Sequence, residues 1–486
     1  MRVASPSEAQ KIDRESVLLS GRPEGFFMNQ AGLRMAEHIR RQFPNSSVRV
    51  GILCGPGHNG GDGFVIAREL WRSGWRNITV FILPAENPSL LWQDQFRRTQ
   101  DLPFEKSPLL GTTVNWKNFD LIVDALFGYG LNRPLNTQLV RLIEEINATQ
   151  IPVFAVDISS GLNAETGRIM GAAFRCQATM AVLPLKLGQV IADGPIVSGR
   201  ILPVDVGFPT EVVRRCTGHH WFVGAKTARR LAPQRPAGAN KSNFGHLFVM
   251  AGSPGMWGAA RLACEAAARM GCGYVYIPKR RGMNGFKPDY LSPTDGLAPG
   301  NRIYSALLAG PGLGRSYQAQ KAVLSLRKRP EPAVIDADAL RIFAESQNWS
   351  HRGDWILTPH AGEMSAILGW SVEKIEGNRP AAVRECAKRT GCTVLLKGYR
   401  SLISQGDQII VIGSGNSALA KAGTGDVLAG MMASLLAQGF STLRAATYAA
   451  WLHGELADSW VRSGKSKASL MASDLLELLK IGGPVY

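Results

Sequence analysis

Cysteine is scarce in this sequence, and its spacing excludes the usual cysteine-based sites. Seven cysteines occur among 486 residues, and no two of them form a CxxC pair of the kind that binds zinc or carries redox chemistry. The odd number also argues against a complete disulfide framework. We therefore expect buried, reduced thiols.

Long hydrophobic runs are absent as well. The first fifteen residues, MRVASPSEAQKIDRE, are polar and lack the apolar core of a signal peptide. No run further along the chain reaches the length of a membrane span. We expect a cytoplasmic protein that does not bind a membrane.

Acidic residues are outnumbered by basic ones. Lysine and arginine total 55 against 38 aspartates and glutamates, which gives a net charge of +17 at pH 7. The basic residues are scattered singly, in pairs or in short clusters, without the interleaved aromatic residues of nucleic-acid-binding surfaces. Nucleic acid is therefore the least expected partner, and the charge suits phosphate-bearing small molecules. The length exceeds what one hydrophobic core supports, so we expect two domains.

The most informative stretch is residues 415–439, GNSALAKAGTGDVLAGMMASLLAQG. Its segment VLAGMMASLLA contains no charge and no proline, which predicts a buried helix. Gly423, Gly425 and Asp426 stand directly before this segment. Backbone N–H groups at a helix start bind phosphate, and Asp426 is placed to take the proton from an attacking hydroxyl. Taken alone, the segment suits a glycine-rich turn with an aspartate cap equally well.

The first half contains a strand, a glycine-rich turn and a helix in succession. Residues 47–54 predict a buried strand, residues 55–63 (GPGHNGGDG) a turn, and residues 64–73 a helix. This is the phosphate-binding arrangement of doubly wound folds. The chain before it predicts one or two helices, with Ser5 and Glu8 spaced as a capping box.

Two further predicted strands end in carboxylates. Asp124 ends the strand at 120–125, and Asp157 ends the strand at 152–158. The carboxyl ends of parallel strands lie along one edge of a sheet, where ligands bind. We therefore expect one cleft to collect Asn59, Asp62, Asp124, Asp157 and Ser160. Each acidic residue alone is better explained as a cap or turn former, but three such strand ends in one sheet favour a site.

These segments resemble the NAD(P)H-hydrate epimerases. The resemblance is carried by GPGHNGGDGFVIAREL, VDALFGYGLNRPL and VDISSGLNAETG. It implies a Rossmann-like domain that interconverts the two C6 epimers of hydrated NADH and NADPH, with Asp157 and Lys186 as the acid–base pair at C6. It also implies a potassium ion on Asn59, Asp124 and Ser160, whose oxygens suit a hard cation. The implied substrate-binding residues are His58, Asn59, Gly60, Gly61, Asp62, Gly128, Tyr129, Gly130, Leu131, Asn132, Arg133, Pro134 and Asp157.

A second α/β unit follows. Its predicted strands end in glycine, aspartate, histidine or lysine, and they lie at 243–252, 305–314, 333–340, 356–363 and 393–398. In a parallel sheet these ends and the GTGD helix would line one cleft. The adjacent pair His219 and His220 has no metal-ligating neighbours in the sequence, so we expect surface or packing roles for both.

This half resembles the ribokinase superfamily and, within it, the ADP- or ATP-dependent NAD(P)H-hydrate dehydratases. The matching segments are NKSNFGHLFVMAGSPGMWGAA, AGPGLG, VIDADAL, TPHAGEM, LLKGYRSLI and ALAKAGTGDVLAGMMASLLAQG. The resemblance implies ADP as co-substrate, magnesium on the nucleotide phosphates, and Asp426 as the base. Implied hydrate contacts are Ala259, Gly312, His360 and Asp426. Implied nucleotide contacts are Lys397, Gly398, Tyr399, Arg400, Ser401, Gly423, Thr424 and Gly425.

The sequence thus predicts an α/β protein with two doubly wound domains. These are a Rossmann-like epimerase domain at 1–215 and a ribokinase-like dehydratase domain at 225–486, acting on NADHX, NADPHX and ADP. We also expect a homo-oligomer. One alternative is a ribokinase-type small-molecule kinase with an N-terminal regulatory domain. Another is a nucleotide-binding protein without turnover. Two features favour it, namely His58 in place of the usual asparagine and the basic segment at 276–305.

Overall fold

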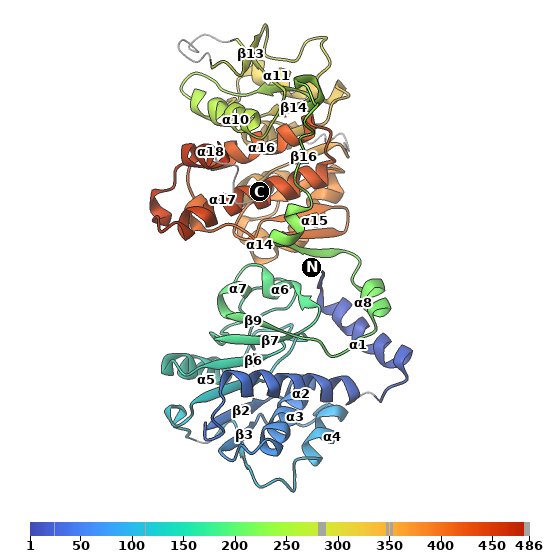
Figure 1. Cartoon of the computed structure of the whole chain (residues 1–486), viewed down its shortest axis with the longest axis vertical. Coiled ribbons are helices and arrows are strands. Elements are labelled where there is room, and N and C mark those ends of the chain that lie inside the picture. The colour runs from blue at the N-terminus through green and yellow to red at the C-terminus, as the bar shows by residue number, and fades with distance from the viewer. Residues whose placement is uncertain (24, 112, 280–287, 347–348, 350–352, 481–486) are drawn as a thin grey trace. The chain divides into compact units, whose positions relative to one another are not determined.

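The computed structural model describes residues 1–23, 25–111, 113–279, 288–346, 349 and 353–480. Contacts divide the chain into an N-terminal unit, residues 2–220, and a C-terminal unit from residue 221 onwards that also includes Met1 (Figure 1). Part of the basic segment mentioned above, residues 280–287, lies outside the described residues. Among the described helices, none is long and apolar enough to cross a membrane.

The N-terminal unit is built on a parallel sheet. Its seven described strands, in spatial order, are β4 (Glu105–Pro108), β3 (Ile78–Ile82), β2 (Val50–Cys54), β5 (Leu121–Ala125), β6 (Val153–Val156), β7 (Ala178–Val182) and β9 (Arg200–Val204). Its helices are α1 (Pro6–Ser20), α2 (Gly25–Gln42), α3 (His58–Arg72), α4 (Leu90–Arg97), α5 (Thr137–Thr149), α6 (Leu187–Val190), α7 (Gly194–Val197) and α8 (Thr210–Cys216).

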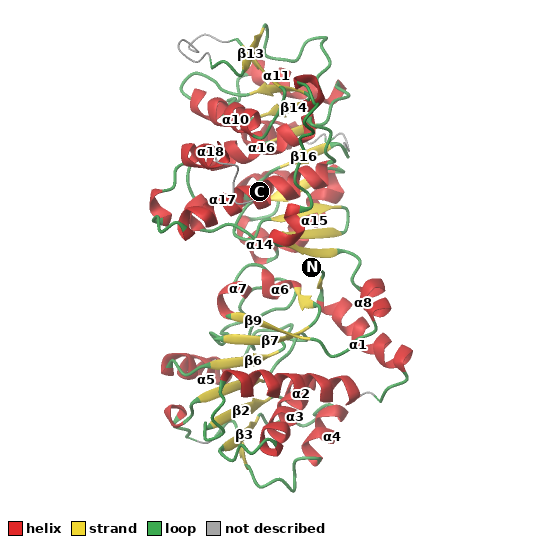
Figure 2. Ribbon diagram, in the orientation of Figure 1, coloured by secondary structure: helices red, strands yellow, loops and turns green. Residues whose placement is uncertain are grey.

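Both faces of this sheet are buried under helices. Successive strand residues point to opposite faces, so Ile52 packs with α2 and α3 while Leu53 packs with α5. Hydrophobic runs such as VGILC are buried throughout for this reason. The arrangement confirms the predicted doubly wound fold (Figure 2).

The glycine-rich segment folds differently from the prediction. The helix expected at 64–73 begins earlier, with His58 as its first residue and Gly57 as its N-cap. Glycine, which has no side chain, allows this early turn to pack closely. A Cβ on Gly60 would lie 1.8 Å from the carbonyl oxygen of Gly55. Most of the predicted turn is therefore the first turn of α3.

Residues 3–8 are fixed within the N-terminal unit. The capping box is confirmed: Ser5 Oγ accepts from the Glu8 N–H at 3.2 Å, and the Ser5 N–H donates to Glu8 Oε2 at 2.8 Å. The short strand β1 (Val3–Ala4) pairs in parallel with β8 (Leu185–Lys186). This pairing brings α1 beside Lys186.

The C-terminal unit contains the larger sheet. Its ten described strands, in spatial order, are β10 (His220–Val223), β19 (Gln408–Ile412), β18 (Leu402–Gln405), β17 (Thr393–Leu396), β16 (Trp355–Leu357), β15 (Ala333–Ile335), β14 (Ala306–Ala309), β11 (His246–Met250), β12 (Tyr274–Pro278) and β13 (Leu291–Thr294). The strands from β17 through β13 run parallel, and β18 is antiparallel to both β17 and β19. Its helices are α9 (Ala225–Arg229), α10 (Trp257–Arg269), α11 (Tyr317–Ser325), α12 (Ala337–Ser346), α13 (Ala361–Leu368), α14 (Val372–Gly377), α15 (Arg379–Thr390), α16 (Thr424–Ala437), α17 (Thr442–Arg462) and α18 (Ala472–Lys480).

Helix α16 lies in the core, as its sequence predicts. Its residues from Val427 to Ala437 are all buried and pack with α10, α17 and strand side chains such as Val249. The next strand residue on the N-terminal side, Phe248, is also buried but points to the other face, so this sheet too is covered on both sides.

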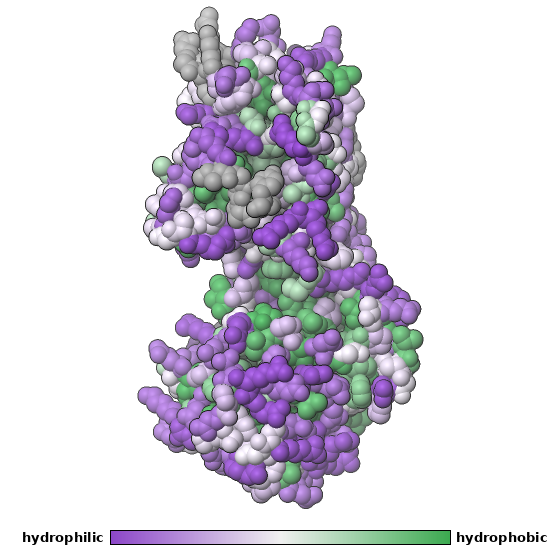
Figure 3. All heavy atoms as spheres, viewed as in Figure 1, coloured by the Kyte–Doolittle hydropathy of each residue, from purple (hydrophilic) through white to green (hydrophobic). Residues whose placement is uncertain are grey.

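The remaining sequence expectations concern thiols and histidines. All seven cysteines are free, and six of them are buried. His220 is buried in β10 and His219 is exposed, in line with packing and surface roles. On the face drawn in Figure 3, hydrophilic side chains cover most of both units, whereas apolar side chains gather on part of the N-terminal unit.

Candidate functional site

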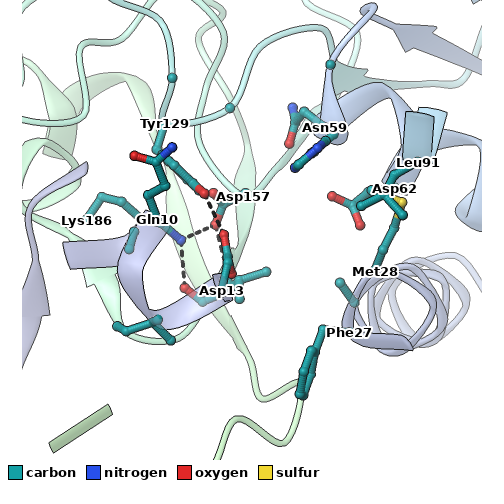
Figure 4. A pocket seen from close by; sticks show the side chains of 18 of the residues that line it. Gln10, Asp13, Phe27, Met28, Asn59, Asp62, Leu91, Tyr129, Asp157 and Lys186 are labelled. Atoms are coloured by element: carbon teal, nitrogen blue, oxygen red, sulfur yellow. Dashed lines mark hydrogen bonds and ion pairs between the residues drawn. The ribbon is translucent and has the colours of Figure 1, made fainter. Parts of the chain in front are cut away.

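A cavity of about 850 Å³ opens at the carboxyl ends of the strands in the N-terminal unit. Its lining includes residues that the sequence predicted, namely His58, Asn59, Asp62, Gly128, Tyr129, Gly130, Leu131, Asn132, Arg133, Asp157 and Lys186. It also includes residues of α1 and α2 that no sequence motif pointed to, among them Gln10, Asp13, Phe27 and Met28. Figure 4 shows how the charged side chains lie around it.

Asp157 is held in an unusual backbone conformation. Its φ of 61° is in the left-handed region, which a residue with a Cβ adopts at some cost in strain. Several hydrogen bonds fix it there. Gln189 Nε2 donates to the Asp157 carbonyl at 2.7 Å, and the Val182 N–H donates to Asp157 Oδ1 at 3.1 Å. The strained backbone aims the carboxylate towards Lys186.

Lys186 forms a buried ion pair with Asp157. Lys186 Nζ lies 2.5 Å from Asp157 Oδ1 and donates a second bond to the Val182 carbonyl at 3.0 Å. These bonds use two of the three ammonium donors. Since both side chains are less than one-tenth exposed, the pair is a fixed dipole at one wall of the cavity.

Asp13 and Tyr129 form a second polar pair beside the first (Figure 4). The Tyr129 hydroxyl donates to Asp13 Oδ2 at 2.5 Å, and Lys186 Nζ lies 5.7 Å from the Tyr129 ring centroid. Burial raises the pKa of Asp13, an effect that the Tyr129 hydrogen bond and Lys186 partly offset. Burial and the neighbouring Asp13 also raise the pKa of Tyr129.

Asn59 and Asp62 lie across the cavity from these pairs (Figure 4). Asn59 Nδ2 and Asp62 Oδ1 are buried, and neither has a hydrogen-bond partner among the described residues. Burial, together with the charges of Asp157 and Asp13, raises the pKa of Asp62 well above its ordinary value. Polar atoms of this kind are available to a polar ligand.

The expectation that five polar residues share one cleft needs correction. Asn59, Asp62 and Asp157 line the cavity, but Asp124 and Ser160 do not. Both are fully buried and bond to each other: Asp124 Oδ2 accepts from the Ser160 N–H at 2.7 Å, and Asp124 Oδ1 accepts from Ser160 Oγ at 2.5 Å. Burial raises the pKa of Asp124 to about 6.

Three further residues predicted to hold substrate are also absent from the cavity lining: Gly60, Gly61 and Pro134. The two glycines serve packing. A Cβ on Gly60 would strike Gly55, and a Cβ on Gly61 would lie 2.8 Å from the sulfur of Met28. Glycine suits close helix packing and ligand approach equally well, so the sequence could not separate these roles.

In the C-terminal unit the predicted strand ends bring charged side chains together. Lys397 follows β17, and its Nζ lies 2.8 Å from Asp336 Oδ1 and 3.5 Å from Glu363 Oε2. Burial lowers the pKa of Lys397, but attraction to Asp336 and Glu363 outweighs that effect and the net shift is upward. Asp338, two residues after Asp336, accepts the Gly314 N–H at 2.8 Å.

Asp426 lies in the first turn of α16, within electrostatic range of the same group. Burial and the charge of Asp336 raise its pKa to about 6, while Lys397 acts in the opposite direction. Gly423 is the helix N-cap with φ of 88°, a conformation that favours glycine. A Cβ on Gly425 would lie 3.9 Å from Lys397 Nζ, so the lysine stands in front of the helix start.

His360 and the turn after β17 complete this group. His360 is the N-cap of α13, where its Nδ1 accepts from the Glu363 N–H at 3.3 Å, and its side chain is half exposed. In the turn, Tyr399 is exposed and Arg400 has φ of 55°. Arg379, which no sequence motif pointed to, donates to the carbonyls of Leu396 and Lys397 at 3.2 and 3.1 Å and so supports the turn.

Ala259 and Gly312 lie against each other. A Cβ on Gly312 would be 2.9 Å from that of Ala259, and Ser253 Oγ donates to the Gly312 carbonyl at 2.9 Å. The loop before α10 and the loop after β14 are therefore joined. Among the described residues, no group of three or more histidine, cysteine, aspartate or glutamate side chains is arranged to hold a metal ion.

Comparisons with known proteins match both units. A family model described as YjeF-related protein N-terminus matches residues 24–188, and one described as NAD(P)H-hydrate dehydratase matches residues 247–480. A bifunctional NAD(P)H-hydrate repair enzyme from Moorella thermoacetica is 33% identical over 511 residues, covering 99% of this chain and 96% of the relative.

The chain belongs to the bifunctional NAD(P)H-hydrate repair enzymes.

Another member of these repair enzymes, from Escherichia coli, is 30% identical and covers 97% of this chain and 92% of its own. Among solved structures, the ADP/ATP-dependent NAD(P)H-hydrate dehydratase from Bacillus subtilis is similar, with 30% identity and a TM-score of 0.49. It covers 54% of this chain and 96% of its own. The family model for the N-terminal part begins after α1, so Asp13 lies outside the matched residues.

Proposed function

We propose that the chain repairs hydrated NADH and NADPH in two steps. The N-terminal unit interconverts the C6 epimers of the hydrate, and the C-terminal unit uses ADP to drive loss of water, giving AMP, phosphate and the restored cofactor. The observation that supports this most is membership of the repair enzymes along nearly the whole chain, with a charged site in each unit.

In the N-terminal unit, Asp157 and Lys186 are proposed to act at C6. The ion pair holds the Lys186 amine at the cavity wall, where it can give a proton to the reacting ring. The part of the cavity lined by residues such as Asn132 and Arg133 would hold the rest of the dinucleotide. Arg133 provides a positive charge for its phosphates.

The residues proposed for potassium fit a monovalent cation. Asn59 is buried, and its Nδ2 has no hydrogen-bond partner among the described residues, so no hydrogen bond of Nδ2 fixes the direction of its side-chain oxygen. The Asp124 carboxylate is fully buried, and its hydrogen-bond donors, Ser160 and the Leu126 N–H, are neutral. Oxygens of Asn59, Asp124 and Ser160 would hold potassium, which would supply a fixed positive charge close to the cavity.

In the C-terminal unit, Asp426 is proposed as the base on the substrate hydroxyl. Hydroxide is a poor leaving group, so phosphorylation of the hydroxyl converts the elimination into loss of phosphate. The first turn of α16, from Gly423 to Gly425, would bind the phosphoryl group, and Lys397 would balance its charge. The ammonium of Lys397 already pairs with the carboxylates of Asp336 and Glu363. We therefore propose that magnesium binds to the nucleotide phosphates and enters the site with them.

Absorbance of reduced nicotinamide tests this proposal. Purified chain, magnesium and mixed hydrate epimers are incubated with ADP or with ATP, and recovery is followed to completion. Full recovery with ADP supports both activities. Recovery that stops at the share of one epimer contradicts the epimerase assignment, and phosphorylated product without recovery favours a small-molecule kinase. The variant Lys186→Ala should lose epimerisation and keep dehydration.

A further inference from the structure

The first helix of the chain contributes to the cavity of the N-terminal unit. Pairing of β1 with β8 fixes its start, with Ala4 opposite Lys186. Along α1, Ile12 packs on Val212 and Cys216 of α8. This anchoring holds Asp13 at the cavity wall, with its carboxylate directed at Tyr129 (Figure 4).

The Asp157–Lys186 pair leaves one part of the chemistry unassigned. Epimerisation at C6 requires breaking a bond at that carbon. In the hydrate, C6 carries both a hydroxyl and the ring nitrogen N1, so the ring can open when a base removes the hydroxyl proton. The electron pair of the C6–N1 bond then passes to nitrogen, which takes a proton from an acid, and C6 becomes an aldehyde. Rotation and the reverse steps give the other epimer with no reagent consumed.

This chemistry needs an acid and a base side by side, because the hydroxyl and N1 are bonded to the same carbon. Lys186 is suited to be the acid. Asp157 is a poor candidate for the base, because its Oδ1 already accepts from both Lys186 Nζ and the Val182 N–H.

We propose that Tyr129 and Asp13 form the basic half of the site: Tyr129 takes the hydroxyl proton of the hydrate as its own proton passes to Asp13. Tyr129 is the catalytic residue in this relay because its hydroxyl exchanges the proton with the substrate, and Asp13 is the positioning residue that receives the relayed proton. The inference rests on the proposed epimerase function of this unit.

Four observations support the relay. The hydroxyl of Tyr129 donates to Asp13 Oδ2 at 2.5 Å, so the path for the proton exists. The Lys186 ammonium stands 5.7 Å from the Tyr129 ring centroid, which places acid and base side by side. Asp13 has no ion pair at hydrogen-bonding distance among the described residues, whereas Asp157 has one. Burial raises the pKa of Asp13, so its carboxylate accepts a proton more readily than an exposed one.

The charged groups around Asp13 come from several elements. Lys186 of β8 favours its ionised form, Asp157 disfavours it, and His58 of α3 adds a favourable interaction when protonated. Asp62 of α3, Arg14 of α1 and Arg133 line the same cavity. The pH dependence of the relay therefore belongs to this group as a whole.

The test compares Asp13→Asn, Tyr129→Phe and the double variant in the full chain. One purified hydrate epimer of NADH is supplied without ADP, so that the C-terminal unit stays idle, and the other epimer is measured by chromatography against an enzyme-free control. The substitution Asp13→Asn keeps an oxygen that accepts from Tyr129 but removes the proton acceptor. Asp94→Asn makes the same chemical change on α4, outside the cavity.

The relay predicts a fall in kcat of about 100-fold for each single variant, with KM within about twofold. The double variant should fall no further than either single one, since both remove one proton path. In the unsubstituted chain the rate should fall as pH drops and Asp13 becomes protonated, and Asp13→Asn should lose this dependence. Asp94→Asn should behave as the unsubstituted chain.

An unchanged kcat in Asp13→Asn would overturn the relay and return the base role to Asp157. Thermal unfolding shows whether Asp13→Asn folds. If it does not fold, the test rests on Tyr129→Phe, and an unchanged kcat in that variant would overturn the proposal. Absence of epimerisation in the unsubstituted chain would instead overturn the proposed epimerase function.

Discussion

Lys397 Nζ lies 2.8 Å from Asp336 Oδ1 and stands in front of the first turn of α16. The lysine thereby joins two strand ends, those of β15 and β17, to the helix that carries Asp426. Because Asp336 raises the pKa of Asp426 and Lys397 lowers it, the proton affinity of the proposed base depends on this contact. The arrangement makes the C-terminal site testable residue by residue.

Asp426→Asn should abolish dehydration and leave epimerisation intact. The amide keeps the shape of the carboxylate but cannot accept the hydroxyl proton, so the rate of dehydration should fall by about 100-fold or more. Recovery of nicotinamide absorbance with ADP measures the loss, and chromatography of the epimers measures the other activity. Asp407→Asn, in the exposed turn between β18 and β19, is the matched control. Loss of both activities in Asp426→Asn would mean that the two sites are not independent.

The pH dependence of dehydration should follow Asp426. Its pKa of about 6 means that the carboxylate, the form that acts as base, is replaced by the acid as pH falls below that value. We expect kcat/KM for the hydrate to decrease about tenfold per pH unit below pH 6 and to level off above pH 7. A profile that is flat between pH 5 and pH 7 would contradict the role of Asp426 as the base.

Two glycines at the start of α16 should respond differently to alanine. A methyl group on Gly425 meets only Lys397 Nζ, at 3.9 Å, so Gly425→Ala should fold normally while narrowing the space for a phosphoryl group. Gly423 has φ of 88°, and its Cβ would lie 2.7 Å from Leu262, so Gly423→Ala should lower the free energy of unfolding by about 1–3 kcal/mol.

Thermal unfolding and dehydration kinetics, measured on both variants, separate these effects. Gly425→Ala should reduce kcat/KM for ADP at unchanged unfolding temperature. If its activity equals that of the unsubstituted chain, the phosphoryl group binds elsewhere.

Much of the candidate site was predictable in its location because parallel strands place their carboxyl ends at one edge. Asp157, Lys397 and Asp426 each follow or precede a buried apolar run, and the topology alone brings such residues to the ligand side of the sheet. The conserved hydrogen-bond geometry of a helix start likewise predicted the location of Asp426 in the first turn of α16.

Other residues gave no local signal. Asp13 is one acidic residue in an amphipathic helix, where acidic residues are common, and only the long-range pairing of β1 with β8 brings it to Lys186. Arg379 is similar, since its contacts with the Leu396 and Lys397 carbonyls follow from the packing of α15 on the sheet. Sequence periodicity indicates which residues share one face of a helix or strand. It does not indicate which distant segments contact each other.

Replacing potassium with a large organic cation should slow epimerisation. Tetramethylammonium cannot fit among Asn59, Asp124 and Ser160, two of which are fully buried. We expect the rate of interconversion to fall in tetramethylammonium chloride relative to potassium chloride at the same ionic strength. The variant Asp124→Asn should be slow in both salts. Equal rates for the unsubstituted chain in both salts would count against this ion site.

His453 should control how the stability of the C-terminal unit depends on pH. It is buried in α17 and its Nε2 has no hydrogen-bond partner among the described residues. Burial lowers its pKa from 6.5 to about 4. A lowered pKa means that folding favours the neutral ring, so this contribution is fully present above pH 6.5 and is lost as pH falls towards 4. The shift corresponds to about 3 kcal/mol.

His453→Phe removes the titrating group while keeping an aromatic ring of similar size. Asp426 acts in the opposite sense, because a raised pKa stabilises the fold at low pH and this contribution is lost as pH rises through about 6. The difference between the variant and the unsubstituted chain at each pH cancels the effect of Asp426. Hydrogen exchange of the α17 amides at pH 7 and pH 4.5 gives that difference locally. We expect the variant to lose less protection than the unsubstituted chain on acidification, and an equal loss in both would mean that His453 is not the group that titrates.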